Sequence, residues 1–298
     1  MLALGQKEGS DMQVSNVTLN NGVEMPQLGF GVWQIVPDER ATAAVSTAFD
    51  AGYRAIDTAP VYTNEGGVGA AIAASDLRRD EIFVTTKLRN SQQGYDTALA
   101  AFDRSLAKLG LDYIDLYLVH WPVPIRDRYL DTWKAFERLY ADGRVRAIGV
   151  SNFEPNHLRR LLDNTDVVPA LNQIEFHPYL QQHELYELHK ELGIVTESWS
   201  PLGHGTSGLP AWLAHPLLED PVIGEIAAKI GRTPAQVILR WHLQLGNVVV
   251  PKSATPARIR ENIALFDFEL SDGDLEAIKA IHRGVRFGPH PNDFIDEF

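Results

Sequence analysis

Eight short apolar runs, each followed by a stretch of helical length, constrain the fold of this chain more than any other feature. They are residues 26–33, 53–59, 82–88, 113–121, 145–153, 170–178, 194–200 and 247–253. The starts of the first seven are about 24 to 32 residues apart, the length of a strand and a crossover helix, which requires parallel pairing. Eight parallel units of this kind predict an α/β fold, a closed (β/α)8 TIM barrel.

Two segments flank or interrupt this pattern. The last gap is longer than the others and holds two expected helices, residues 221–231 and 234–246. Upstream of the first run, residues 17–25 predict two strands around Asn21 and Gly22, a dipeptide typical of a type I′ hairpin turn. We expect this N-terminal β-hairpin to cap one end of the barrel.

The length of the chain agrees with a single barrel domain spanning residues 1–298. Residues 1–12 are expected to form a loose N-terminal lead-in. After Arg283 the sequence is rich in glycine and proline, which predicts a C-terminal loop over the barrel and no further helix.

An open, doubly wound sheet is the alternative fold. It would normally bind a dinucleotide through a GxGxxG motif after its first strand. The first run here ends in LGFGVW, and the nearest glycine-rich stretch, EGGVGAAI, has Ile72 where the third small residue should be. The barrel is therefore the preferred interpretation.

Charge and composition argue against several classes of partner. With 27 basic and 39 acidic residues the net charge is −12, which repels nucleic acid and anionic membranes. The chain has no cysteine, so no disulfide, thiolate nucleophile or cysteine metal site is possible. It shows no signal peptide and no apolar run of about 18 residues. We expect a cytoplasmic monomer that acts on small molecules.

Ionisable side chains stand at the ends of three consecutive predicted strands. Asp57, Lys87 and His120 each follow an apolar run, and Tyr62 lies in the loop just past Asp57. Reactive groups of barrels lie at the carboxyl ends of the strands, so these four should meet at one mouth. Any one of them alone is more simply explained as structural, for example as part of a barrel ion pair. All four on adjacent strands predict a catalytic site.

These residue types suit a general acid whose pKa is set by its neighbours. A free tyrosine has a pKa of about 10, and a lysine cation about 4 Å away stabilises the phenolate by several kcal/mol. We therefore expect Lys87 to lower the pKa of Tyr62, and Asp57 to keep Lys87 charged. His120 can orient a carbonyl oxygen by donating a hydrogen bond.

A group that protonates a carbonyl oxygen needs a second group that attacks the carbon. The sequence has no HExxH motif and no serine nucleophile elbow. Its ten histidines have no compact ligand spacing, so no metal site is expected. The remaining candidate for the group that attacks the carbon is a hydride donor, which would bind across the same mouth of the barrel.

Three long motifs give the chain a family resemblance. They are GYRAIDTAPVYTNEGGVG at 52–69, VRAIGVSNF at 145–153 and VPKSATPARIRENI at 250–263. In these motifs the sequence resembles the aldo-keto reductase superfamily, from Val17 to about Phe294. The tail and SWSPLG look most similar to the prokaryotic branch that includes 2,5-diketo-D-gluconate reductases.

The resemblance implies a function and a cofactor. Asp57, Tyr62, Lys87 and His120 correspond to the catalytic tetrad of an enzyme that reduces aldehydes and ketones with NADPH. Small dicarbonyls, aromatic aldehydes and keto-sugars are the implied substrates. The resemblance also implies contacts with the nicotinamide. Its carboxamide is assigned to Ser151, Asn152 and Gln173, and the aromatic platform under its ring is assigned to Trp199.

Two segments are expected to bind the phosphates of the cofactor. The first is a glycine-containing loop at residues 199–205, which includes Ser200, Pro201, Leu202 and Gly203. The second is a helix start after the eighth strand, where barrels commonly bind phosphate, and it includes Lys252, Ser253, Thr255 and Arg258. The family match implies that Lys252 and Arg258 hold the adenosine 2′-phosphate, which favours NADPH over NADH. It also implies that Glu261 and Asn262 contact adenine.

The substrate pocket is expected among aromatic residues at the mouth. Trp33 ends the first predicted strand and Trp121 follows His120, and the segment RFGPHPNDF can complete an aromatic rim. Phe30 and Tyr53 are expected in the core.

Two other functions are considered besides a reductase. One is a barrel aldolase with Lys87 as a Schiff-base nucleophile, which requires a lysine of lowered pKa. The other is a sensor or regulatory subunit on the same fold that binds NADPH without turnover.

Overall fold

The computed structural model describes residues 14–203 and 217–295. The expected lead-in at residues 1–12 lies outside the described residues, as do residues 204 and 205 of the glycine-containing loop.

Eight parallel strands form one sheet in which each strand pairs with its neighbours in the sequence. They are β3 (Phe30–Gly31), β4 (Ala55–Asp57), β5 (Phe83–Leu88), β6 (Ile114–Val119), β7 (Val145–Ser151), β8 (Leu171–Glu175), β9 (Val195–Trp199) and β10 (Val248–Val249). The first and last strands also meet, because Gly29 N donates to Val249 O at 2.8 Å and Gly31 N to Pro251 O at 3.1 Å. The sheet is therefore closed, and the predicted (β/α)8 barrel is confirmed.

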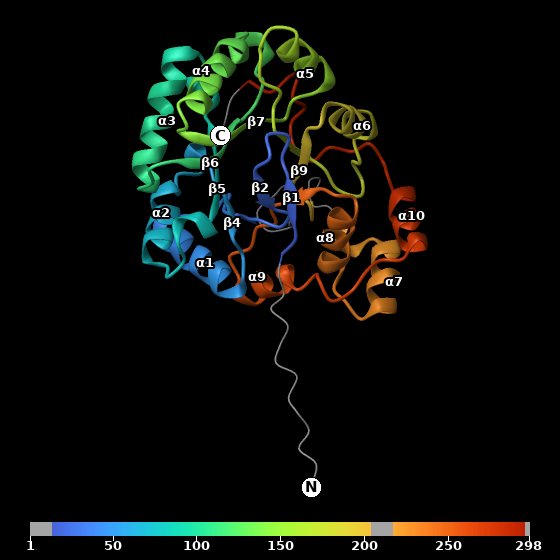
Figure 1. The fold of residues 1–298 in the computed structure, drawn as a ribbon. Coiled ribbons are helices and arrows are strands. Elements are labelled where there is room, and N and C mark those ends of the chain that lie inside the picture. The colour runs from blue at the N-terminus through green and yellow to red at the C-terminus, as the bar shows by residue number, and fades with distance from the viewer. Residues whose placement is uncertain (1–13, 204–216, 296–298) are drawn as a thin grey trace.

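Helices surround this barrel (Figure 1). Those of the repeating units are α1 (Asp38–Ala51), α2 (Glu65–Ala74), α3 (Tyr95–Leu109), α4 (Tyr129–Ala141), α5 (Pro155–Leu162), α6 (His183–Leu192), α8 (Pro234–Gln244) and α9 (Pro256–Ile263). Two more, α7 (Pro221–Ile230) and α10 (Asp272–Ala280), lie side by side and are joined by Lys229 and Asp274 at 2.8 Å. Short 3-10 helices lie in the loops: η1 (Pro60–Tyr62), η2 (Arg79–Glu81), η3 (Asn90–Gln92), η4 (Pro124–Arg126) and η5 (Leu217–Glu219).

The helix boundaries follow from local sequence. Thr233 and Gln236 form a capping box at the start of α8, and Ser271 and Asp274 form one at the start of α10. Both pairs satisfy backbone N–H groups that the first turn of a helix leaves without partners. The two helices predicted in the long gap before β10 are observed as α7 and α8.

The inside of the barrel is filled by an apolar layer at its amino end. This layer includes inward-facing leucine, phenylalanine, alanine and valine side chains of the strands, together with Leu19 and Met25 of the N-terminal hairpin. The hairpin consists of β1 (Asn16–Thr18) and β2 (Glu24–Pro26) and lies across the centre of the barrel in Figure 1. It closes this end of the barrel, as predicted.

The turn of the hairpin differs from the prediction. Gly22 N donates to Leu19 O at 2.8 Å, and Leu19 N donates to Val23 O at 2.9 Å. Gly22 has a φ of 83°, but Asn21 does not have a positive φ. A type I′ turn requires positive φ at both central residues, so the type I′ prediction is wrong. The chain instead turns between Leu19 and Gly22 and closes with a glycine bulge.

The described residues contain no helix that is long and apolar enough to cross a membrane. After α10 the chain continues to residue 295 as a loop, in agreement with the prediction for the C-terminal segment.

Candidate active site

The four expected catalytic side chains meet at the carboxyl end of the barrel. Lys87 Nζ lies 2.7 and 2.8 Å from the carboxylate oxygens of Asp57 and 3.4 Å from Tyr62 Oη. The rings of Tyr62 and His120 are 6.0 Å apart, centroid to centroid. The structure therefore places an ammonium, a carboxylate, a phenol and an imidazole around one point. Their roles in catalysis stay predictions.

Lys87 is held in its charged form by this arrangement. Its side chain is fully buried. Burial acts to lower the pKa of Lys87, but the carboxylate of Asp57 and the phenol of Tyr62 outweigh it and leave that pKa raised. Lys87 also donates to the Thr58 carbonyl oxygen at 3.0 Å. A lysine held in this way is a poor nucleophile, which argues against the Schiff-base aldolase.

A buried asparagine fixes the loop that carries Tyr62. Asn64 accepts a hydrogen bond from Thr58 Oγ1 at 2.9 Å and donates to the carbonyl oxygens of Val32 and Ile35 at 2.8 and 3.1 Å. It thereby ties the loop after β4 to the loop after β3. Asn64 was not among the site residues predicted from the sequence, although it lies in the first motif, two positions after Tyr62.

The residues expected around the nicotinamide lie beside His120 at the ends of β7 and β9. Asn152 Nδ2 donates to His120 O and to Ser151 Oγ, both at 3.0 Å, and Asn152 Oδ1 accepts from Trp199 Nε1 at 2.8 Å. Asn152 has a φ of 63°, a left-handed conformation that asparagine tolerates better than most residues. The structure brings these residues together and hydrogen-bonds them to one another.

A second buried carboxyl group lies next to the Asp57–Lys87 pair. Gln173 Nε2 donates to Asp57 Oδ2 at 2.9 Å and to Glu197 Oε2 at 2.7 Å. Burial first, and the charge of Asp57 second, raise the pKa of Glu197 to about 8. Glu197 was not among the site residues predicted from the sequence. Its signal was a glutamate inside an apolar strand, two residues before Trp199 and so on the same side of β9.

The loop after β9 makes a tight turn. Gly203 N donates to Ser200 O at 2.9 Å, and Ser200 has a φ of 47°. This turn, with Pro201 and Leu202 between its ends, is the described part of the loop expected to approach the pyrophosphate.

The start of α9 presents positive charge to solvent. Lys252 and Arg258 are exposed, and Thr255 N donates to Ser253 Oγ at 3.1 Å. Thr255 makes no side-chain cap, so N–H groups of the first turn are available to an anion. Although the side chain of Lys252 reaches solvent, the protein around it removes part of its hydration, and this desolvation first, and the charge of Arg40 second, lower the pKa of Lys252. Arg40, from α1, is a third cation at this place that the sequence analysis missed.

The two residues expected to contact adenine face the protein. Glu261 Oε1 accepts from Thr233 Oγ1 at 2.8 Å, which ties α9 to the start of α8. Asn262 is buried. Their contact with adenine stays a prediction.

The two tryptophans expected to line the substrate pocket differ in exposure, and their contact with substrate stays a prediction. Trp33 is 38% exposed, whereas Trp121 is 8% exposed because Phe294 of the tail covers it, with ring centroids 4.3 Å apart. Phe30 and Tyr53 are buried in the core, as predicted.

A buried glutamate holds the C-terminal tail across the mouth. Glu175, at the end of β8, accepts from Phe287 N at 2.6 Å, from Gly288 N at 3.2 Å and from His177 Nε2 at 3.0 Å. A Cβ at Gly288 would lie 2.5 Å from the Trp199 ring, so the tail backbone rests on that tryptophan. Glu175 was not among the site residues predicted from the sequence, although it ends a strand as Asp57 does.

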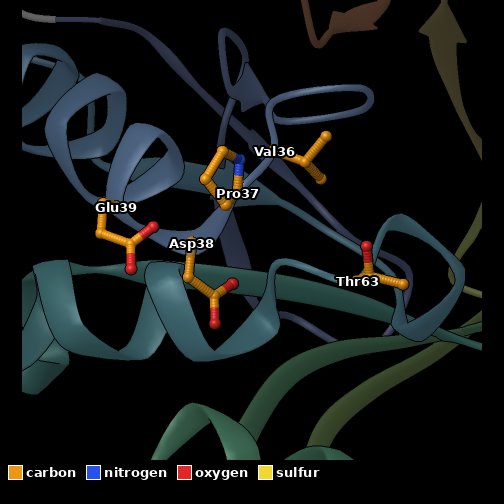
Figure 2. Close-up of a pocket in the computed structure, with 5 residues that line it drawn as sticks. All are labelled: Val36, Pro37, Asp38, Glu39 and Thr63. Carbon is orange, nitrogen blue, oxygen red and sulfur yellow. The ribbon is translucent and has the colours of Figure 1, made fainter.

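The described residues also form a pocket of about 550 Å3, and Figure 2 shows the side chains that line it. It lies between the first turn of α1 and the loop after β4, and it is lined by Val36, Pro37, Asp38, Glu39 and Thr63. Its two carboxylates would repel phosphate, and none of the four expected catalytic residues lines it. We therefore assign no part of the cofactor to this cavity.

Comparison with known proteins places the chain in a family. A family profile described as "Aldo/keto reductase family" matches residues 27–283. The chain belongs to the aldo/keto reductase family. This reductase is accordingly an oxidoreductase, and the resemblance found in the three sequence motifs is confirmed.

Curated and solved relatives are similar over nearly the whole chain. An aldo-keto reductase of Mycolicibacterium smegmatis is 55% identical over 93% of this reductase and 97% of its own length. The glyoxal reductase of Bacillus subtilis is 49% identical over 94% and 97%. The crystal structure of an aspartate-to-alanine mutant of Gox0644 in complex with NADPH has a TM-score of 0.87, with 46% identity and coverage of 94% and 98%. That complex agrees with the cofactor expected from the sequence.

Proposed function

We propose that this protein is an NADPH-dependent carbonyl reductase that converts small dicarbonyls, aromatic aldehydes or keto-sugars into alcohols, with Tyr62 as the general acid. The observation that carries this proposal is the buried Lys87 ammonium, which lies between the Asp57 carboxylate and the Tyr62 hydroxyl. The glyoxal reductase similarity makes dicarbonyls the first substrates to test.

The chain supplies proton transfer and orientation. When bound, NADPH supplies the hydride for the carbonyl carbon. Tyr62 gives its proton to the carbonyl oxygen, and Lys87 stabilises the phenolate that remains. Asp57 keeps Lys87 cationic at neutral pH. His120 orients the carbonyl oxygen by a hydrogen bond from the other side of the site.

The residues of the mouth fit this cofactor. The carboxamide of the ring can donate hydrogen bonds through its nitrogen, and Ser151, Asn152 and Gln173 offer acceptor oxygens at the ends of β7 and β8. The 2′-phosphate needs cations, which Lys252, Arg258 and Arg40 provide in a protein of net charge −12. Trp199 is the proposed platform for the nicotinamide ring.

We also propose that the reductase works as a single-domain monomer in the cytoplasm. One closed barrel accounts for the strands from β3 to β10, and the chain needs no disulfide. Light scattering of the purified protein should give a mass near the 33.2 kDa of the chain, and a stable dimer mass would contradict the proposal.

Turnover measurements test the central claim. NADPH absorbance at about 340 nm is followed with methylglyoxal, phenylglyoxal, 4-nitrobenzaldehyde and 2,5-diketo-gluconate, and again with NADH. Tyr62→Phe should lower kcat by about 100-fold or more, because a positioned general acid contributes about that factor. Its NADPH affinity, measured by fluorescence quenching, should stay within about twofold of that of the unmodified protein.

A matched control and two contrary outcomes make the test decisive. Tyr95→Phe, at an exposed tyrosine of α3, should leave kcat unchanged. Full turnover by Tyr62→Phe would reject the acid assignment. Tight NADPH binding by the unmodified protein without turnover on any carbonyl would instead favour the sensor.

A further inference from the structure

Glu197 is a buried carboxyl group at the mouth to which the proposed reaction gives no role. It lies on β9, and its side chain is withdrawn from solvent. Gln173 Nε2 donates to Glu197 Oε2 at 2.7 Å, and Glu197 Oε1 has no hydrogen-bond partner among the described residues. A buried carboxyl with one amide donor is costly to ionise.

The same amide nitrogen serves two carboxyl groups. Gln173 Nε2 donates to Asp57 Oδ2 at 2.9 Å as well as to Glu197. The opposite orientation of the amide would place its oxygen against the Asp57 carboxylate, which is repulsive because both atoms are acceptors. The two carboxyl groups therefore fix the orientation of the amide. They leave Oε1 as the atom of Gln173 that can accept a hydrogen bond from a ligand.

We propose that Glu197 is a positioning residue that fixes the Gln173 amide toward the cofactor, and that its ionisation shifts the preference of the site from NADPH to NADP⁺. This inference rests on the proposed function, because it requires a nicotinamide at the mouth. The oxidised nicotinamide ring is cationic and the reduced ring is neutral. A new negative charge beneath the site therefore stabilises the oxidised form selectively.

The groups that face Glu197 from the neighbouring strands determine the net charge around it. From β4 and β5 the groups are Asp57 and Lys87, which form an ion pair of zero net charge. From β8 the facing residue is the neutral Gln173, and from β10 it is the apolar Val248. Ionisation of Glu197 would therefore add one uncompensated negative charge. With a pKa of about 8, this happens as the pH rises through the mildly alkaline range.

Cofactor affinities measured against pH test the inference. The dissociation constants of NADP⁺ and NADPH are measured for the full chain by fluorescence quenching between about pH 6.5 and 9.5. Their ratio, NADP⁺ over NADPH, should fall by about tenfold with a midpoint near pH 8, the order of effect expected of one nearby charge. Ionisation of the 2′-phosphate affects both nucleotides alike and cancels in the ratio.

Three variants assign the effect. Glu197→Gln removes the charge with little change of shape, and its ratio should stay at the low-pH value throughout. Glu65→Gln removes another buried carboxyl of raised pKa, which bonds Thr86 and does not contact Gln173, and it should behave as the unmodified protein does. Tyr62→Phe should keep the pH dependence, because the phenol is not its source.

Each contrary outcome is informative. A ratio that does not change with pH in the unmodified protein would overturn the inference, even if Glu197→Gln fails to fold. So would a pH dependence that is lost in Tyr62→Phe or retained in Glu197→Gln. If both nucleotides bind and carbonyls are reduced while the ratio stays flat, the proposed function stands and the inference fails. If neither nucleotide binds at any pH, both are wrong.

Discussion

At the scale of single residues, Lys87 shows how a charge is kept inside this mouth. An ammonium removed from water is stable only beside a compensating charge. Asp57 provides that charge through two hydrogen bonds, and the carbonyl oxygen of Thr58 accepts a third. The charge of Lys87 therefore depends on Asp57.

Replacing Asp57 tests this dependence. Asp57→Asn leaves Lys87 buried without a counterion, so the free energy of unfolding should fall by about 3 to 5 kcal/mol. The turnover number should also drop strongly, because an uncharged Lys87 no longer stabilises the Tyr62 phenolate. Urea unfolding and NADPH consumption measure the two effects.

An exposed ion pair serves as the control. Asp80 pairs with Arg78 at 3.0 Å, and both side chains are about 70% exposed. Asp80→Asn should change neither stability nor turnover measurably, because solvent screens such a pair. If Asp57→Asn also changed neither stability nor turnover, the charge of Lys87 would not depend on Asp57.

At the scale of the elements, glycines allow two helices to approach closely. A Cβ at Gly69 of α2 would lie 2.4 Å from the carbonyl oxygen of Leu109, the last residue of α3. Backbone cannot yield as a flexible side chain does, so the two helices would have to separate. The glycines of the motif EGGVG thus belong to the packing of α2.

The two helical glycines Gly69 and Gly224 should respond to alanine in opposite ways. Gly69→Ala should lower the free energy of unfolding by about 1 to 3 kcal/mol through overpacking. Gly224→Ala, in α7, meets no atom within 4 Å and should raise it by up to about 1 kcal/mol, because alanine favours the helix. Urea unfolding of the two variants decides, and a loss of the same size in both would show that packing of α2 is not the cause.

Most elements could be predicted because the alternation of apolar runs and helices is a local pattern. The positions of Asp57, Lys87 and His120 followed from strand ends in the same way. The role of Glu197 could not be predicted, since it depends on Gln173 from the neighbouring strand and Asp57 from across the barrel. The predicted type of the hairpin turn was wrong because the dipeptide Asn21-Gly22 does not by itself decide which two residues occupy the central positions of the turn.

At the scale of the whole molecule, buried histidines set the response to acid. His157, His189 and His242 are buried, and burial is the main cause that lowers their pKa values to about 4, 3 and 3. All three are therefore neutral in the folded protein at pH 5, whereas in the unfolded chain they are protonated below about pH 6.5.

The folded protein should therefore lose stability as the pH falls below about 6.5. The unfolded state binds protons there that the folded state does not bind, at about 1.4 kcal/mol per pH unit for each histidine. Calorimetry between about pH 7 and 5 should show the melting temperature falling. His242→Phe should reduce the slope by up to about a third. A full slope in His242→Phe would contradict this account.

The tail held by Glu175 also bears on how the protein is made. Phe287 N, which donates to Glu175, follows it by 112 residues. The strands that carry Asp57, Lys87 and His120 leave the ribosome long before that segment. The mouth therefore remains uncovered through most of synthesis, with Trp199 and Trp121 lacking the backbone and the ring that rest on them in the finished protein. Residues 283–295, and not the strands, set the moment in translation at which the site is complete.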